Sequence, residues 1–195
     1  MSLIPAFQID LWNAWILIAL NFSIPMFASL INKEGVARAM GTGENAPQSS
    51  KTQKMVLLVT HGIIMPVTMF YSIFLPLKLE TAWLYLGLPI CFLAMIIGLM
   101  AGVSFATTPP DAPVVNGIYR ISRHPIYLEG FLINLGVGIA CASWFFIVCA
   151  LLWIICMGIG VIDEERFLLQ KYGETYREYV EQTPRWIGMP KSKKG

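Results

Sequence analysis

The chain has 195 residues, of which 56% are hydrophobic and only 13% are charged, whereas a soluble domain carries roughly 25% charged residues. Its formal net charge is only +2, and no basic stretch is interleaved with aromatic residues, so nucleic acid is not an expected partner. The composition therefore excludes an ordinary soluble domain. It predicts an all-α integral membrane protein that forms a single membrane domain over residues 1–195.

Four stretches contain no Asp, Glu, Lys or Arg: residues 11–32, 55–77, 81–110 and 130–162. Each reaches the ~20 residues that cross a hydrocarbon core as a helix. The residues before the first stretch include no Lys or Arg, so this stretch is expected to be a permanent span rather than a signal peptide.

The last uncharged stretch has 33 residues and would measure about 50 Å as one helix, which exceeds a ~30 Å core. It is expected to break near Ala142-Ser143 into a short helical hairpin. Glycines in both halves are expected to let the two backbones approach closely: Gly136, Gly138, Gly158 and Gly160. Five transmembrane helices are therefore predicted, at about 10–31, 54–77, 82–104, 126–141 and 144–161.

The positions of Lys and Arg predict the orientation. With the N-terminus outside, only Lys78 faces outward, and the other basic residues lie in the cytoplasm. Four spans instead of five would leave the basic tail after Arg166 on the wrong side. The four cysteines lie inside apolar stretches without a C-x-x-C pattern, so they are expected to pack as small apolar residues, and no metal site is expected.

Two charged clusters interrupt this apolar pattern. The first is R-I-S-R-H-P-I-Y-L-E-G, at Arg120–Gly130, and the second is D-E-E-R, at Asp163–Arg166. Pro125 is a favourable first helical residue because its missing N–H needs no partner there, so the fourth span is expected to begin at His124-Pro125. Glu129 falls in the first turn, where a helix N-terminus favours an anion.

The predicted hairpin would bring the two clusters together at one membrane surface. The residues expected to face one another are Arg120, Arg123, His124 and Tyr127 from the first cluster and Glu164 and Glu165 from the second. A positive-inside anchor or a solvated ion-pair network would also explain these charges. Ionisable groups at the edge of a membrane core nevertheless often mark a site. Cationic donors and carboxylates beside an apolar cavity suit a zwitterion with an apolar or aromatic part.

Three segments carry a resemblance to a known family: G-I-Y-R-I-S-R-H-P-I-Y at 117–127, D-E-E-R-F-L-L-Q-K-Y-G-E-T-Y-R-E-Y at 163–179, and T-P-R-W at 183–186. In combination they resemble the isoprenylcysteine carboxyl methyltransferase family, and phospholipid N-methyltransferases share a similar C-terminal pattern. The resemblance covers roughly the last 80 residues, whereas the first two predicted spans show none.

This resemblance implies S-adenosylmethionine as the methyl donor, held by a segment at 111–195. His124 and the backbone N–H groups at the start of this helix would take the methionine carboxylate, and Glu164 would take the ammonium or the ribose hydroxyls. The residues expected to bind the cofactor, including an adenine wall, are His124, Tyr127, Glu164, Tyr119, Leu128, Val114, Ile118, Gly117 and Pro125. Arg120, Arg123 and Glu165 are assigned to the acceptor side and to catalysis. No G-x-G-x-x-G follows a predicted strand, so a soluble Rossmann methyltransferase is excluded.

The resemblance favours carboxyl O-methylation of an isoprenylcysteine-like lipid that enters from the bilayer, with phospholipid N-methylation as the alternative. A carboxylate acceptor is ionised at neutral pH and needs no base, whereas an ammonium acceptor must first lose a proton, for which Glu165 is the candidate. Eukaryotic family members carry an arginine about one turn before the paired acids. Here that region reads Gly158-Ile159-Gly160, so Arg120 or Arg123 would replace it.

Two further functions stay open at this point. A nicotinamide-dependent membrane reductase would need Arg120 and Arg123 for a second nucleotide's phosphates, and a non-catalytic scaffold would bind neither nucleotide. An amphipathic cytoplasmic C-terminal helix is also expected, because Leu168, Tyr172, Tyr176 and Tyr179 recur every three or four residues. The expected location is a multi-pass protein of the cell membrane or the endoplasmic reticulum, with a cytoplasmic active site and no obligate protein partner.

Overall fold

The computed structural model describes residues 7–31, 50–109 and 111–188, and in this part of the chain every regular element is a helix, with one isolated bridge between Asn13 and Pro76 in the connecting segments. The elements in chain order are α1 (Trp15–Ile31), α3 (Lys51–Leu57), η1 (Leu58–Ile64), α4 (Met65–Ser72), α5 (Ala82–Thr107), η2 (Gly117–Arg120), α6 (Pro125–Ala140), α7 (Trp144–Tyr172) and α8 (Glu174–Gln182). The predicted all-α class is confirmed.

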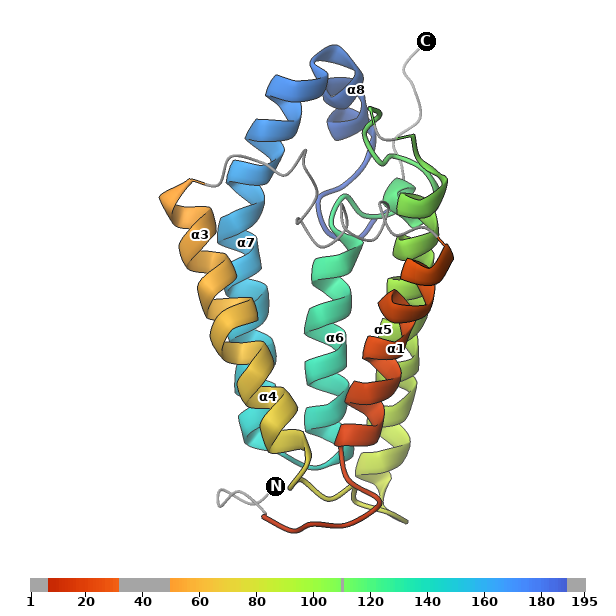
Figure 1. The fold of residues 1–195 in the computed structure, drawn as a ribbon, viewed down its shortest axis with the longest axis vertical. Coiled ribbons are helices and arrows are strands. Elements are labelled where there is room, and N and C mark those ends of the chain that lie inside the picture. Colours follow the sequence, from red (N-terminus) through yellow and green to blue (C-terminus); the bar gives the residue numbers. More distant parts are fainter. Residues whose placement is uncertain (1–6, 32–49, 110, 189–195) are drawn as a thin grey trace.

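The long helices form one bundle that runs along the longest axis of the molecule (Figure 1). α6 lies at its centre, with α7 and the α3–η1–α4 segment on one side and α1 and α5 on the other (Figure 1). At one end of the bundle, backbone hydrogen bonds join the connecting segments. Lys78 N–H donates to Ala140 O at 3.2 Å, and Leu77 N–H donates to Trp12 O at 3.0 Å. The other end holds the start of α6, the end of α7 and α8, and there the charged clusters meet.

Three helical segments in the described part are long and apolar enough to cross a membrane: Lys51–Ser72, Ala82–Thr107 and Trp144–Tyr172. Two shorter apolar helices accompany them, Trp15–Ile24 and Pro125–Ala140. A membrane protein is thus supported, while the count of five spans and their orientation stay predictions.

The second predicted span contains a feature that its composition did not indicate. Residues Leu58–Ile64 form a π-helix between α3 and α4, and the N–H of Met65 bonds five residues back to Thr60 O. Pro66 follows immediately and has no N–H to donate, so the ordinary ladder is already interrupted at this point.

The helix that contains the fifth predicted span extends beyond it. α7 does not end at 161 but continues as one helix of 29 residues to Tyr172. Its last part, D-E-E-R-F-L-L-Q-K-Y, is polar yet consists largely of good helix formers, so nothing stops the helix before Gly173. Gly173 ends it with a φ of 56°, a conformation that favours glycine. The predicted amphipathic tail is therefore divided between the end of α7 and the separate helix α8.

The predicted break of the hairpin is confirmed, because α6 ends at Ala140 and α7 begins at Trp144. Ala142 turns the chain with a φ of 51°. The four glycines that were expected between α6 and α7 do not all lie there. Of the two on α6, Gly138 faces α7, since a Cβ there would lie 2.9 Å from Ile147, whereas a Cβ at Gly136 would meet Cys91 of α5. Gly160 faces Val56 of α3, and Gly158 has Trp186 as its neighbour.

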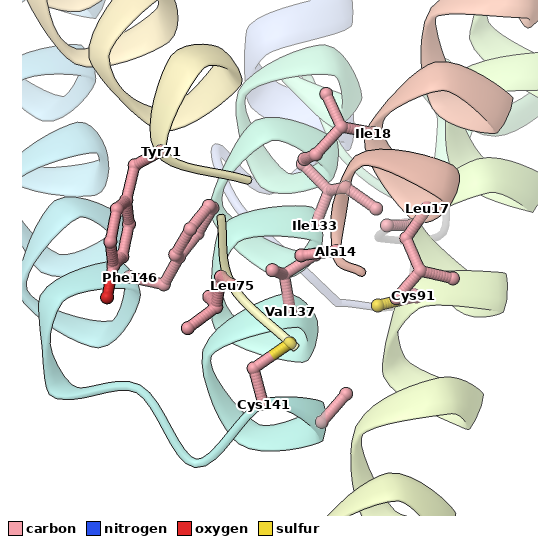
Figure 2. Close-up of a cluster of buried hydrophobic side chains, with 12 residues drawn as sticks. Ala14, Leu17, Ile18, Tyr71, Leu75, Cys91, Ile133, Val137, Cys141 and Phe146 are labelled. Atoms are coloured by element: carbon pink, nitrogen blue, oxygen red, sulfur yellow. The ribbon is translucent and has the colours of Figure 1, made fainter. Parts of the chain in front are cut away.

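An apolar core lies at the end of the bundle that holds the connection from α6 to α7, and it fixes the position of α6 (Figure 2). Ile133 and Val137 of α6 belong to this core together with Leu17 of α1 and Cys91 of α5. On the opposite side, the ring of Tyr71 lies 4.9 Å from that of Phe145, and Phe146 is fully buried beside it. This core joins α1, α4, α5, α6 and α7, so the start of α6 is held in place relative to the end of α7.

Candidate functional site

The start of α6 presents His124 as its N-cap and Pro125 as its first residue, as predicted. Ser122 fixes this turn, because its Oγ accepts a hydrogen bond from the His124 N–H at 3.1 Å. Trp153 of α7 supports the next turn by donating from Nε1 to the Tyr127 carbonyl oxygen at 3.2 Å. A Cβ at Gly130 would lie 2.4 Å from the Trp153 ring, so the glycine permits this close approach of α6 and α7.

His124 lies between the two neighbouring glutamates of α7. Its Nε2 is 3.1 Å from Glu165 Oε1, and its Nδ1 is 3.7 Å from Glu164 Oε2. Because an ionised carboxylate only accepts hydrogen bonds, Nε2 is the donor to Glu165. His124 is 4% exposed, so its imidazole forms a buried contact with both carboxylates. Binding of the cofactor carboxylate by His124 stays a prediction, since both ring nitrogens already face acids.

Glu165 is buried and is surrounded by cationic groups. Arg185 forms a bidentate ion pair with Glu165, with Nε 3.2 Å from Oε1 and Nη2 2.7 Å from Oε2. Arg123 adds an ion pair, with Nη1 3.0 Å from Oε1. The hydrogen bond to Glu165 raises the pKa of the Arg185 guanidinium above its ordinary value. The Glu165 carboxylate therefore holds together three segments of the chain, namely the turn before α6, α7 and the segment after α8.

Glu164 has a different environment, although it is the adjacent residue. The Tyr127 hydroxyl donates to its Oε2 at 2.6 Å, and its side chain remains 26% exposed. The Tyr127 ring stacks on the His124 ring, with centroids 5.4 Å apart and planes only 5° apart. Consecutive helical residues differ by about 100° in direction, and His124 sits between the two acids, so each faces a different ring nitrogen. Glu164 is the more accessible acid of the pair.

Arg120 departs from the prediction that it faces the acids. It ends the short 3₁₀ turn η2, is exposed, and makes no ion pair with Glu164 or Glu165 in the described part of the chain. In this turn Tyr119 points inward and Arg120 outward, which the linear spacing of R-I-S-R-H-P did not reveal. Gly117 opens the turn with a φ of 55°.

Most of the predicted adenine wall gathers in an aromatic cluster that we define by Ala101, Ile118, Tyr119, Tyr176 and Tyr179, with Val114 and Ile126 packed against it. The Tyr179 hydroxyl donates to the Tyr119 carbonyl oxygen at 2.6 Å, which ties α8 to η2. Burial raises the pKa of Tyr176 and of Tyr179 well above the ordinary phenol value, so both hydroxyls stay protonated. Leu128 is half-buried and does not belong to this cluster.

The segment after α8 supplies contacts that the sequence reasoning did not assign. T-P-R-W was noted only as part of the resemblance, yet Arg185 is the closest cationic partner of Glu165, and the Trp186 ring lies 6.2 Å from that of His124. The backbone holds this segment in place, since Arg123 N–H donates to Pro184 O at 3.1 Å and Gly188 N–H donates to Ile121 O at 3.2 Å. An irregular segment has no periodicity, so the only available signal was the T-P-R-W motif itself.

The donor set fits S-adenosylmethionine. Nε of the buried Arg123 guanidinium has no hydrogen-bond partner among the described residues, and a buried unpaired donor of this kind suits a carboxylate. Glu164 offers a partly exposed carboxylate to an ammonium or to ribose hydroxyls, and the aromatic cluster offers an apolar surface to adenine. Among the described residues, no three His, Cys, Asp or Glu side chains lie close enough together to hold a metal ion.

Comparison with known proteins adds one finding and one absence. No curated protein matches the sequence. A family model described as phospholipid methyltransferase matches residues 90–175, a segment that includes Arg123, His124, Tyr127 and both glutamates and stops before Arg185. This match confirms the resemblance drawn from the sequence; it covers slightly less than half of the chain, and over this segment the chain is similar to the phospholipid methyltransferases.

Proposed function

We propose that the protein is an integral membrane methyltransferase that uses S-adenosylmethionine to methylate a lipid-like acceptor. The observation that carries this proposal is the buried Arg123–His124–Tyr127 group against Glu164 and Glu165, inside the segment that matches the methyltransferase family. The position of this group at one end of an apolar bundle suits a polar cofactor from the aqueous side and an amphiphile from the bilayer.

The residues divide into binding and positioning roles under this proposal. When bound, S-adenosylmethionine supplies an electrophilic methyl group on its sulfonium. Arg123 Nε would hold the methionine carboxylate and Glu164 the ammonium, because these are the groups with unpaired or accessible capacity. Glu165 would position Arg123 and His124, since its carboxylate is bonded to both of them and to Arg185. Alignment and exclusion of water are the contributions expected of these side chains.

Two classes of acceptor are considered under this proposal, one with a carboxylate and one with an amine. An isoprenylcysteine-like carboxylate would need a cation beside the methyl group, for which Arg123 is the candidate because Arg120 points outward. The region one turn before the acids contains no arginine, and Gly158 there lies beside Trp186. A phospholipid amine would instead need a carboxylate that takes up its proton, for which Glu165 is the candidate from the sequence. The distribution of Lys and Arg supports a cytoplasmic site in either case.

Binding measurements on the full chain in detergent test the proposal directly. Adenosylhomocysteine should bind, and NADPH should not, when each is titrated by calorimetry. Labelled S-adenosylmethionine should then transfer its methyl group to at least one member of a panel of prenylcysteines and amine-bearing phospholipids. NADPH binding without adenosylhomocysteine binding would instead support a membrane reductase, and binding of neither would support a scaffold.

A further inference from the structure

A carboxylate outside the network of His124 lies where α1, α5 and α6 meet. Glu129 of α6 accepts a hydrogen bond at its Oε1 from Asn21 Nδ2 of α1, over 2.7 Å. On α5, Gly98 makes room for it, because a Cβ there would lie 3.2 Å from Glu129 Cγ. Glu129 and Tyr127 are two residues apart and therefore differ by roughly 200° around the helix. Glu129 thus faces the side of α6 away from Glu164 and Glu165, towards Asn21 of α1 and Gly98 of α5.

The hydrogen bond to Asn21 does not explain why residue 129 is an acid. Asn21 is a neutral amide, and among the described residues Glu129 has no ion pair. A glutamine would accept the same hydrogen bond without the cost of placing a charge in an apolar bundle. Ionisable residues within membrane segments are rare and mark functional sites by default. The ionisable character of Glu129 therefore calls for a partner that the described residues do not provide.

The depth of Glu129 relates it to the proposed cofactor site. Ile126 lies three residues earlier on the same side of α6 and packs against the aromatic cluster. Glu129 consequently lies about one helical turn further into the bundle than this cluster, on the membrane side of the proposed adenine wall. An amphiphile whose chain lies in the bilayer would place its polar head at this depth.

We infer that Glu129 and Asn21 bind the polar head of the acceptor, and that the carboxylate selects a cationic, amine-bearing amphiphile over a carboxylate-bearing one. The inference rests on the proposed methyltransferase function and names the charge of its acceptor. An ammonium supplies the positive charge that Asn21 lacks and offers N–H donors to Glu129. A carboxylate head would meet a like charge in surroundings of low polarity, where repulsion is strong.

The test uses full-length protein in nanodiscs of neutral phospholipid, with dodecylamine and dodecanoate as probes and empty nanodiscs as the baseline. Wild-type protein should bind dodecylamine saturably and more tightly than dodecanoate. Glu129→Gln keeps the size and the bond to Asn21, and it should weaken dodecylamine binding at least tenfold, whereas Glu129→Asp should retain part of it. Glu178→Gln, at an exposed acid of α8, is the matched control and should change nothing.

A second measurement avoids dependence on a variant that folds. Dicyclohexylcarbodiimide modifies carboxyl groups in apolar surroundings, and peptide mass spectrometry of the wild-type protein reports the extent at Glu129. Dodecyltrimethylammonium, a cationic amphiphile with no amine that could trap the activated carboxyl, should protect Glu129 from modification, and neutral dodecanol should not. Equal modification with and without dodecyltrimethylammonium, tighter binding of dodecanoate, or unchanged dodecylamine binding by Glu129→Gln would each overturn the inference.

Adenosylhomocysteine binding, measured in the same nanodiscs, separates this inference from the proposed function. Wild-type protein and Glu129→Gln should bind it with the same Kd, because Glu129 lies outside the proposed cofactor contacts. If adenosylhomocysteine binds while the amine results fail, only the acceptor assignment is wrong. If adenosylhomocysteine itself does not bind, the proposed methyltransferase function fails.

Discussion

The two ends of the bundle are closed by different chemistry. At the end near the start of α5, buried Asn13 donates through Nδ2 to two backbone carbonyls, Gln8 O at 2.6 Å and Ile73 O at 2.7 Å. At the end near α8, the buried contacts join ionisable side chains, with Glu165 against Arg123, His124 and Arg185. Neutral hydrogen bonds suffice to tie loops together. The costlier ionic arrangement at the other end is therefore the one that invites a functional explanation.

The largest effect should come from Glu165→Gln. This change leaves the buried Arg123 guanidinium without its acid, and breaking a buried ion pair costs about 3–5 kcal/mol of stability. Thermal unfolding in detergent, followed by circular dichroism, measures the loss. Glu174→Gln is the matched control, because its pair with Arg177 is largely exposed and such pairs contribute about 0–1 kcal/mol. If Glu165→Gln and Glu174→Gln lowered the stability equally, the buried ion pairs of Glu165 would contribute no more than an exposed surface pair.

The next effect should come from the neutral end. Asn13→Ala removes both hydrogen bonds of the buried amide, which should lower stability by about 2 kcal/mol. The same calorimeter should find adenosylhomocysteine affinity unchanged in the folded variant. Weakened binding would mean that the two ends are coupled, contrary to the division drawn above.

A smaller effect, on binding rather than on stability, is expected for Glu164→Gln. Loss of one charge-assisted hydrogen bond should weaken adenosylhomocysteine by about 1.5–2 kcal/mol, or roughly tenfold to thirtyfold. The unfolding temperature should change little, because this side chain is partly exposed and bonds to one tyrosine. A large loss of stability with intact binding would exchange the roles assigned to the two glutamates.

The smallest effect should come from Arg120→Ala. Arg120 is exposed and has no ion pair with either glutamate in the described region, so adenosylhomocysteine affinity should stay within about twofold. Arg123→Ala is the informative companion, since it removes the buried guanidinium with the unpaired Nε and should weaken binding. Equal effects of the two substitutions would contradict the distinction between them.

The sequence anticipated the parts of this arrangement that depend on regular geometry. A proline after His124 predicts the helix start, and a hairpin of two short spans predicts that R-H-P-I-Y meets D-E-E; the contacts of His124 with both acids agree with this. The length of α7 was missed because the span was ended where apolar residues end, although helix propensity continues to Tyr172. The outward direction of Arg120 depends on a 3₁₀ turn, and Arg185 reaches Glu165 from an irregular segment; neither leaves a periodic signal.

The unbroken length of α7 has a mechanical consequence. The same helix carries Trp153 in its apolar part and Glu164 and Glu165 further along, and it continues unbroken through Gly158 and Gly160 between them. At ~1.5 Å per residue it measures about 43 Å, more than a ~30 Å hydrocarbon core. A bilayer of different thickness changes the tilt of such a helix. Because α7 is continuous, a change in its tilt also moves Glu164 and Glu165. The thickness of the lipid bilayer is therefore expected to affect the geometry of the site.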